Sequence, residues 1–135
     1  MNFFSQVGQD RYLLENFFRG KRGGVFVDIG AYDGEKFSNT LFFERTMDWT
    51  GLCVEPTESA FAMLKNVRRS VCEQVCVADF EGEAEFIESS EASNEKMLSR
   101  LAAFSDPRQE QRFAASESRV IRKVPVTRLS TLLEK

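Results

Sequence analysis

Acidic residues and glycines are combined in one short stretch, Gly24 to Gly34, which reads GVFVDIGAYDG. Its apolar run ends at Asp28 and opens into a turn that contains Gly30 and Gly34. Glycine allows unusual dihedrals and lets the backbone approach a bound molecule closely, because no Cβ intervenes. An apolar run that leads directly into glycines predicts a buried parallel strand whose carboxyl end forms a ligand-binding loop.

A second carboxylate, Glu55, stands at the end of the next predicted strand. Adjacent parallel strands end on the same edge of a sheet, and open α/β sheets bind ligands at that edge. A carboxylate there can accept hydrogen bonds from both ribose hydroxyls of an adenosine. Asp79 follows a third predicted strand, further along the edge, where it can reach an adenine amino group. The alternative for Asp28 and Glu55 is that they only cap turns.

The spacing D-x-G-x-x-x-G distinguishes between adenosine-containing cofactors. It lacks the G-x-G-x-x-G spacing of dinucleotide-binding folds. S-adenosylmethionine carries a sulfonium and an ammonium but no phosphate, so its site needs carboxylates rather than a helix N-terminus aimed at a pyrophosphate. The pattern therefore favours S-adenosylmethionine over the alternative of NAD or another nucleotide. A further alternative is a non-catalytic interaction module, in which truncation leaves a partner-docking surface at Leu129, Leu132 and Leu133.

Apolar periodicity predicts alternating helices and strands, and hence an α/β fold with a parallel sheet and right-handed crossovers. Predicted helices cover residues 5–19, residues 38–48 with Ser38 as N-cap, a segment that Thr57 caps, residues 97–104, and a segment that Thr127 caps. Predicted strands cover residues 25–29, 51–55, 70–78, 83–87 and 120–126. Residues 83–87 are expected to pair back onto 70–78 as a hairpin.

Length and composition limit the number of domains, the kind of core and the classes of function. A chain of 135 residues is expected to form one domain, and 13 phenylalanines predict a core of aromatic packing. The net charge of −3 gives no electrostatic footprint for nucleic acid, and no apolar stretch is long enough for a membrane span. The absence of histidine excludes Ser-His-Asp and Cys-His catalysis as well as zinc sites that need imidazole.

The three cysteines are Cys53, Cys72 and Cys76. Cys72 and Cys76 lie on one face of a predicted strand, roughly 13 Å apart, which is too far for a disulfide and poor for a shared metal. We expect reduced, buried, structural thiols, a cytoplasmic setting and no metal site.

Residues 88–118 are rich in Ser, Glu, Gln and Arg and contain few large apolar side chains. This composition predicts a mobile surface insertion. The arginines of this part of the chain are interleaved with acids, so a solvated face is expected rather than an anion-binding patch.

Six motifs resemble the FkbM-type methyltransferases, in order along almost the whole chain. They are SQVGQD (residues 5–10), FVDIGAYDG (26–34), SNT (38–40), WTGLCVEP (49–56), V-x-D-x-x-G-x-x-x-F (77–86) and VPVTRLSTLL (124–133). The resemblance implies a Rossmann-like class I methyltransferase fold, with helices on both faces of the sheet. It also implies S-adenosylmethionine as cofactor and a small-molecule acceptor, usually a hydroxyl of a sugar or natural product.

The resemblance also implies roles for individual residues. The methionine side of the cofactor would be lined by four residues of the first loop: Asp28, Gly30, Ala31 and Gly34. Glu55 would hold the ribose, and Asp79 would be a weaker adenine contact.

Five further residues carry two interpretations each. Gln6, Gln9 and Asp10 either fold over the cofactor or cap and pack the first helix. Ser38 and Asn39 either touch the amino acid end of the cofactor or cap a helix. No general base is identified, and the oligomeric state is left open.

Members of the family continue beyond the segment at residues 124–133 into a strand with a D-x-E-G motif and further strands that build the acceptor site. This chain ends at Lys135 without that motif. We therefore expect the N-terminal part of a larger enzyme, truncated after the third-strand region, which holds the donor-binding edge.

Overall fold

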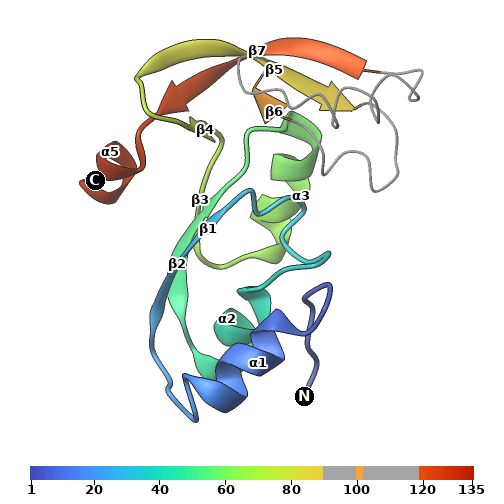
Figure 1. Cartoon of the computed structure of the whole chain (residues 1–135), viewed down its shortest axis with the longest axis vertical. Helices are drawn as coiled ribbons and strands as arrows, with labels where there is room; N and C mark the ends of the chain where they lie inside the picture. Colours follow the sequence, from blue (N-terminus) through green and yellow to red (C-terminus); the bar gives the residue numbers. More distant parts are fainter. Residues whose placement is uncertain (90–99, 102–118) are drawn as a thin grey trace. The chain divides into compact units, whose positions relative to one another are not determined.

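A computed structural model describes residues 1–89, 100–101 and 119–135 (Figure 1). The chain forms two compact units, Met1–Gln74 and Val75–Lys135. Whether the two units make up the single domain expected from the chain length stays a prediction.

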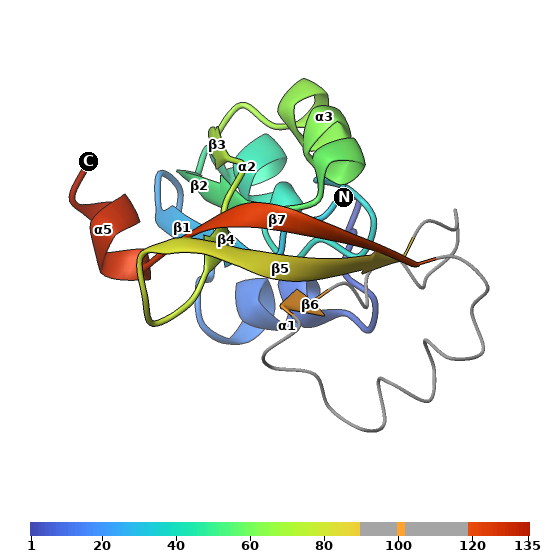
Figure 2. The same cartoon turned by 90° about the horizontal axis from the view of Figure 1, so that it is seen from above.

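The first unit alternates helices with the strands of a parallel sheet. The strands are β1 (Val25–Ile29), β2 (Thr50–Val54) and β3 (Val71–Glu73), and they lie in the order β1-β2-β3. The helices are α1 (Gln9–Asn16), α2 (Leu41–Met47) and α3 (Glu58–Val67). The predicted α/β class and the parallel pairing are confirmed for this unit. Figures 1 and 2 show all three helices on one side of the sheet.

The side of β1 that points away from the helices is exposed. Val25, Val27 and Ile29 alternate along the strand and are 75%, 40% and 52% exposed. Phe26 and Asp28 point to the helix side and are partly buried. The prediction of a buried β1 is therefore wrong for one face, because the helices of Met1–Gln74 do not cover both faces of its sheet as expected.

The core of the first unit consists mainly of aromatic side chains between α2 and its neighbours. Phe42, Phe43, Met47 and Trp49 are buried there. The ring of Phe18, which follows α1, packs edge-on against Trp49 at 5.0 Å between centroids. The predicted aromatic core is confirmed in this unit.

The second unit is a mixed sheet followed by a short helix. Its elements are β4 (Cys76–Val77), β5 (Gly82–Ser89), β6 (Arg100–Leu101), β7 (Arg119–Thr127) and α5 (Leu129–Leu133). The strand order is β4-β7-β5-β6, with β7 parallel to β4 and antiparallel to β5. The long ladder between β5 and β7 is visible in Figure 2. The strand predicted at residues 120–126 is confirmed as part of β7.

The third predicted strand, residues 70–78, is divided between the two sheets. Its first part is β3, which pairs with β2, and its last part is β4, which pairs with β7. The predicted hairpin between 70–78 and 83–87 is wrong, because β7 lies between β4 and β5. The reason is length: β7 offers β5 a ladder from Gly82 to Ser89, whereas β4 has only two residues.

Residues 88–118 fall largely outside the described residues, and so does the predicted mobility of this insertion. At its start, Glu88 and Ser89 belong to β5. The helix predicted at 97–104 is contradicted at Arg100–Leu101, which form β6 and pair with Phe86 and Ile87. The rest of that prediction lies outside the described part of the chain.

Helix ends were predicted less well than helix positions. α1 begins after Gly8 and ends at Asn16, earlier than the expected stop at Gly20. Thr57 is the N-cap of α3, as expected, but its side chain makes no capping hydrogen bond. Thr127 is the last residue of β7, and Arg128 takes the N-cap position of α5 instead.

Candidate functional site

The carboxyl ends of β1 and β2 lie side by side. Ile29 and Val54 are partners in the parallel register, and the N–H groups of Gly30 and Ala31 both donate to the carbonyl of Val54, at 2.8 and 3.0 Å. Asp28 and Glu55 therefore stand at the same edge of the sheet, as the sequence predicted. Whether they bind a cofactor there stays a prediction.

Glu55 joins the glycine loop to β2. Its Oε2 accepts a hydrogen bond from the N–H of Tyr32, and its Oε1 accepts one from the N–H of Thr57, each at 2.9 Å. The residue is only 6% exposed. Because the two amides lie on different segments, the carboxylate fixes the loop after β1 against the start of α3.

The loop backbone passes repeatedly through positive φ. Gly30 and Gly34 have φ values of 80° and 87°, and Tyr32 between them has φ 54°. A side chain in this region costs roughly 1–2 kcal/mol, so Tyr32 is strained, and its hydrogen bond to Glu55 helps to hold it. At Gly34 an added Cβ would also lie 2.9 Å from Cδ1 of Leu64, whereas nothing lies within 4 Å at Gly30. Gly34 thus serves packing as well as conformation, and Gly30 leaves open space beside the backbone.

Asp28 is held from the helix side by two residues that the sequence analysis did not select. Its Oδ2 accepts a hydrogen bond from Oγ1 of Thr40 at 2.5 Å, and Nη1 of Arg68 lies 3.9 Å from the same oxygen. Arg68 follows α3, and an arginine next to a helix C-terminus is favourable for the helix alone. Its position in the sequence therefore does not indicate a functional role. The available signal was Glu44, which stands in α2 next to the buried Phe42 and Phe43 and requires a partner.

Glu44 is the counter-ion of Arg68. It is 2% exposed, and its Oε2 accepts a hydrogen bond from Nε of Arg68 at 3.1 Å. Burial alone would raise the pKa of Glu44, but hydrogen bonds from Ser70, the charge of Arg68 and backbone amides lower it below its usual value. The pair is therefore ionised inside the fold.

Ser38 shows the contacts of the capping alternative. Its Oγ accepts hydrogen bonds from the N–H groups of Thr40 and Leu41, at 3.2 and 3.1 Å, where α2 begins. Thr40 is assigned the N-cap position itself, so the predicted start of this helix at Ser38 is displaced by two residues. Asn39 is exposed. A cofactor contact of Ser38 or Asn39 stays a prediction.

Asp10 also shows the capping contacts. It is fully buried, and it accepts hydrogen bonds from the N–H groups of Phe4, Ser5 and Arg11 and from the hydroxyl of Ser5. Burial raises the pKa of Asp10, but these hydrogen bonds outweigh it and lower the pKa below its usual value. Gln6 and Gln9 are exposed, and Oε1 of Gln9 accepts a hydrogen bond from the N–H of Val7 at 3.1 Å.

A bridge between Ser5 and Phe37 connects this opening segment to the end of the glycine loop. The segment therefore shapes the surroundings of the loop, while a direct cofactor contact by Gln6, Gln9 or Asp10 stays a prediction.

Asp79 belongs to the second unit, where it follows β4. Its carbonyl accepts a hydrogen bond from Nε of Arg128 at 2.9 Å. The proposed adenine contact of Asp79 stays a prediction.

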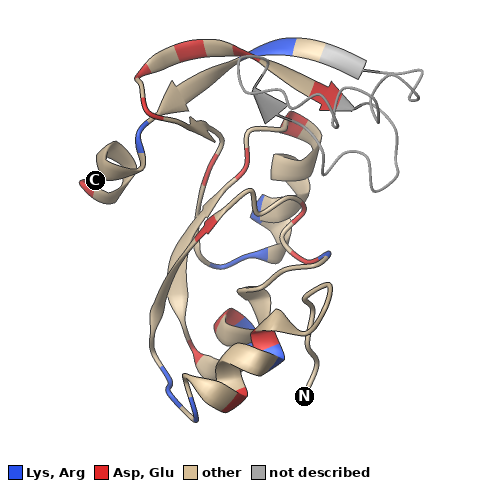
Figure 3. Ribbon diagram, in the orientation of Figure 1, with Lys and Arg blue, Asp and Glu red and all other residues tan. Residues whose placement is uncertain are grey.

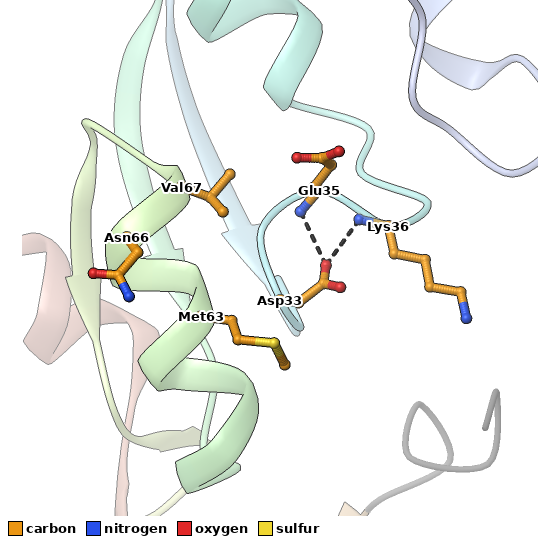
Figure 4. A pocket seen from close by; sticks show the side chains of 6 residues that line it. All are labelled: Asp33, Glu35, Lys36, Met63, Asn66 and Val67. Atoms are coloured by element: carbon orange, nitrogen blue, oxygen red, sulfur yellow. Dashed lines mark hydrogen bonds between the residues drawn. The ribbon is translucent and has the colours of Figure 1, made fainter. Parts of the chain in front are cut away.

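A pocket of about 500 Å³ lies between the glycine loop and α3. Figure 4 shows the residues that line it: Asp33, Glu35, Lys36, Met63, Asn66 and Val67. The Asp33 carboxylate accepts hydrogen bonds from the N–H groups of Glu35 and Lys36, at 3.0 and 2.8 Å, and so folds the loop on itself. None of the predicted cofactor residues lines this pocket, so we do not assign the cofactor to it.

The three cysteines carry free thiols, and only Cys53 is fully buried. Burial raises the pKa of Cys53 to about 12, which keeps it a neutral thiol. Cys53 and Cys72 are partners in the register of β2 and β3, a pairing that the sequence analysis did not consider. Among the described residues, no group of His, Cys, Asp and Glu side chains is placed to hold a metal ion, and no helix is long and apolar enough to span a membrane.

The parallel sheet, with a glycine loop and two carboxylates at its carboxyl edge, places the first unit in the α/β class. Residues 28–135 match the family described as the Methyltransferase FkbM domain. The chain belongs to this family, as the resemblance of its motifs predicted. The matched residues include Asp28, Glu55 and Asp79 and leave out the opening motif at 5–10. No curated protein and no solved structure matches the chain.

Proposed function

We propose that this chain binds S-adenosylmethionine and serves the transfer of its methyl group to a hydroxyl oxygen of a sugar or natural product. The observation that carries the proposal is the joint position of Asp28 and Glu55, at one edge of a parallel sheet and on either side of a glycine loop, in a member of the FkbM methyltransferase family.

The residues present fit this cofactor. Glu55 would accept the ribose hydroxyls, Asp28 would face the cationic amino acid end, and the backbone around Gly30 has open space where a ligand can approach. When bound, S-adenosylmethionine supplies an electrophilic methyl group, so the chain mainly binds and orients. We assign no catalytic residue and no general base.

The NAD alternative fits less well. A pyrophosphate needs unused N–H groups at a helix N-terminus. At the start of α2, the N–H groups of Thr40 and Leu41 already donate to Oγ of Ser38. The negative charge of Asp28 beside Thr40 would also repel phosphates.

A non-catalytic interaction module remains the third candidate. Leu133 of α5 is 57% exposed, whereas Leu132 is buried, so α5 leaves an apolar side chain for a partner. Stable association with another protein, together with no binding of adenosyl ligands, would favour it.

The class of acceptor and the cellular compartment are also part of the proposal. Figure 3 shows both signs of charge distributed over the described elements, with acidic residues on β5 and basic residues on β7. This mixture supports a small-molecule acceptor rather than nucleic acid or a membrane surface. The free thiols support a cytoplasmic setting.

Isothermal titration calorimetry with S-adenosylhomocysteine tests the proposal. We expect the unmodified chain to bind this ligand, and Glu55→Gln to weaken binding roughly 10- to 100-fold, because a hydrogen bond to a charged group contributes about 1.5–3 kcal/mol. Glu15→Gln, on the exposed surface of α1, is the matched control and should leave binding unchanged.

Two results would contradict the proposal. One is no binding by the unmodified chain, and the other is tighter binding of NADH than of S-adenosylhomocysteine. Equal affinities of the Glu55→Gln and Glu15→Gln variants would remove Glu55 from the site.

A further inference from the structure

Arg68 has a fully buried guanidinium, and the hydrogen bonds described for this group go to one segment, residues 34–44. Its side chain is 0% exposed. The guanidinium donates to the carbonyl of Gly34 (3.3 Å), to Oγ of Ser38 (3.4 Å), to Oγ1 of Thr40 (2.8 Å) and to Oε2 of Glu44 (3.1 Å). These four acceptors run from the end of the glycine loop into α2. One side chain after α3 therefore joins the second half of the connection between β1 and α2 to α2 itself.

Arg68 also acts on Asp28 through Thr40. Nη2 of Arg68 donates to Oγ1 of Thr40, so the single hydroxyl hydrogen of Thr40 is directed to Oδ2 of Asp28. Nη1 of Arg68 lies 3.9 Å from the same Oδ2. The Asp28 side chain is still 17% exposed, so its carboxylate is oriented from the inside while part of it faces outward.

The charge of Arg68 is balanced by Glu44 rather than by Asp28. Glu44 is the closer carboxylate, and it is further held by the N–H groups of Arg69 and Ser70 and by the Ser70 hydroxyl. Asp28 is therefore not the main counter-ion of Arg68, and its carboxylate can accept a cationic ligand group.

We propose that Arg68 is a positioning residue for the amino acid end of the cofactor, which rests on the proposed function. Arg68 fixes the end of the glycine loop through its hydrogen bond to the carbonyl of Gly34, and it orients Asp28 through the hydroxyl of Thr40. A lysine at this position would keep the charge but lose the planar fork, so it cannot reach all four acceptors.

The test separates the two ends of the ligand. S-adenosylhomocysteine carries ribose, adenine and the amino acid, whereas 5′-methylthioadenosine lacks the amino acid. We expect Arg68→Lys to raise the dissociation constant of S-adenosylhomocysteine at least tenfold and to change that of 5′-methylthioadenosine less than twofold. Calorimetry on the full chain measures both.

Arg69→Lys is the matched control. Arg69 follows Arg68 directly, and its Nη2 donates to the carbonyl of Glu44 instead of to the loop. We expect both ligands to bind this variant within twofold of the unmodified chain.

A second pair of variants keeps the test valid if Arg68→Lys does not fold. Thr40→Val removes the hydroxyl that links Arg68 to Asp28, and it should weaken S-adenosylhomocysteine selectively. Thr40→Ser restores the hydroxyl and should restore the affinity.

The outcomes separate this inference from the proposed function. If the unmodified chain binds both ligands and the Arg68 and Thr40 variants weaken both equally, Arg68 is a structural residue and the proposed function stands. If the unmodified chain binds neither ligand, the proposed function fails and this inference fails with it.

Discussion

Three carboxylates of the first unit differ in the groups that hold them. Glu55 is held by two backbone amides, Asp28 by a hydroxyl, and Glu44 by a guanidinium. These hydrogen bonds fix the orientations of Glu55 and Asp28 at the edge of the sheet, and Nη1 of Arg68 lies 3.9 Å from Oδ2 of Asp28. Such preorganisation is what a binding site for a cation and a ribose requires.

The two loop glycines give a prediction at this scale. Gly30→Ala meets open space and should lower the free energy of unfolding by about 1 kcal/mol, the conformational cost of positive φ. Gly34→Ala adds a contact of 2.9 Å with Leu64 and should cost about 2 kcal/mol or more. Urea unfolding of both variants measures the difference. Equal losses would mean that Leu64 and Arg68 move aside freely.

The sequence alone allows some residues of the candidate site to be predicted, but not all of them. Asp28, Gly30 and Glu55 stand at the ends of apolar runs and Gly34 in the loop that follows, so their place at a sheet edge could be predicted from local pattern. Arg68 could not, because its acceptors precede it by many residues and no periodic pattern encodes such a contact. The residues next to a side chain in the sequence allow its burial to be predicted, but they do not allow its hydrogen-bond partners to be predicted.

At the scale of elements, the start of α5 is held from outside the helix. The Glu81 carboxylate accepts hydrogen bonds from Oγ1 of Thr131 (2.5 Å), Oγ1 of Thr127 (2.7 Å) and the N–H of Arg128 (3.1 Å). The turn between β4 and β5 thus provides the cap that Thr127 was predicted to provide.

This cap implies a pH dependence. Hydrogen bonds from Thr131, Thr127 and Arg128 lower the pKa of Glu81 from its usual 4.5 to about 2. Because the folded pKa is depressed, the stabilising contribution is present above pH 4.5 and is lost as the pH falls through about 2. The Glu81 side-chain carbon shift in an NMR titration should stay constant from pH 6 to 3. A midpoint inside that range would contradict the cap.

The matching substitution is Glu81→Gln, which removes the charge at neutral pH. We expect faster hydrogen exchange at the amides of Leu132 and Glu134, which donate to the carbonyls of Arg128 and Ser130. Glu85→Gln, at an exposed position on β5, should leave this exchange unchanged.

The open face of β1 gives a second prediction for an element. Val25 is 75% exposed, so Val25→Thr should change the free energy of unfolding by less than about 0.5 kcal/mol. Phe42 is fully buried in the aromatic core, and Phe42→Ala should cost about 3–5 kcal/mol. Thermal or urea unfolding measures both. A large loss in the Val25→Thr variant would show that this face is covered in solution.

Element types were predicted better than element partners. β1, β7 and the N-cap of α3 follow from short-range patterns of apolar, turn and capping residues. The division of residues 70–78 between two sheets does not, because the same alternation satisfies either neighbour. Pairing depends on which strand offers the longer ladder, and that information is distant in sequence.

At the scale of the whole molecule, the break at Gln74 separates the two sheets without cutting a ladder. Every strand pair among the described residues is made within its own unit. Asp28, Glu55, Arg68 and all the partners described for them precede this point, and Asp79 follows it. Under the proposed function, the residues proposed for the ribose and the amino acid end are therefore encoded before residue 75, whereas the proposed adenine contact is encoded after residue 74.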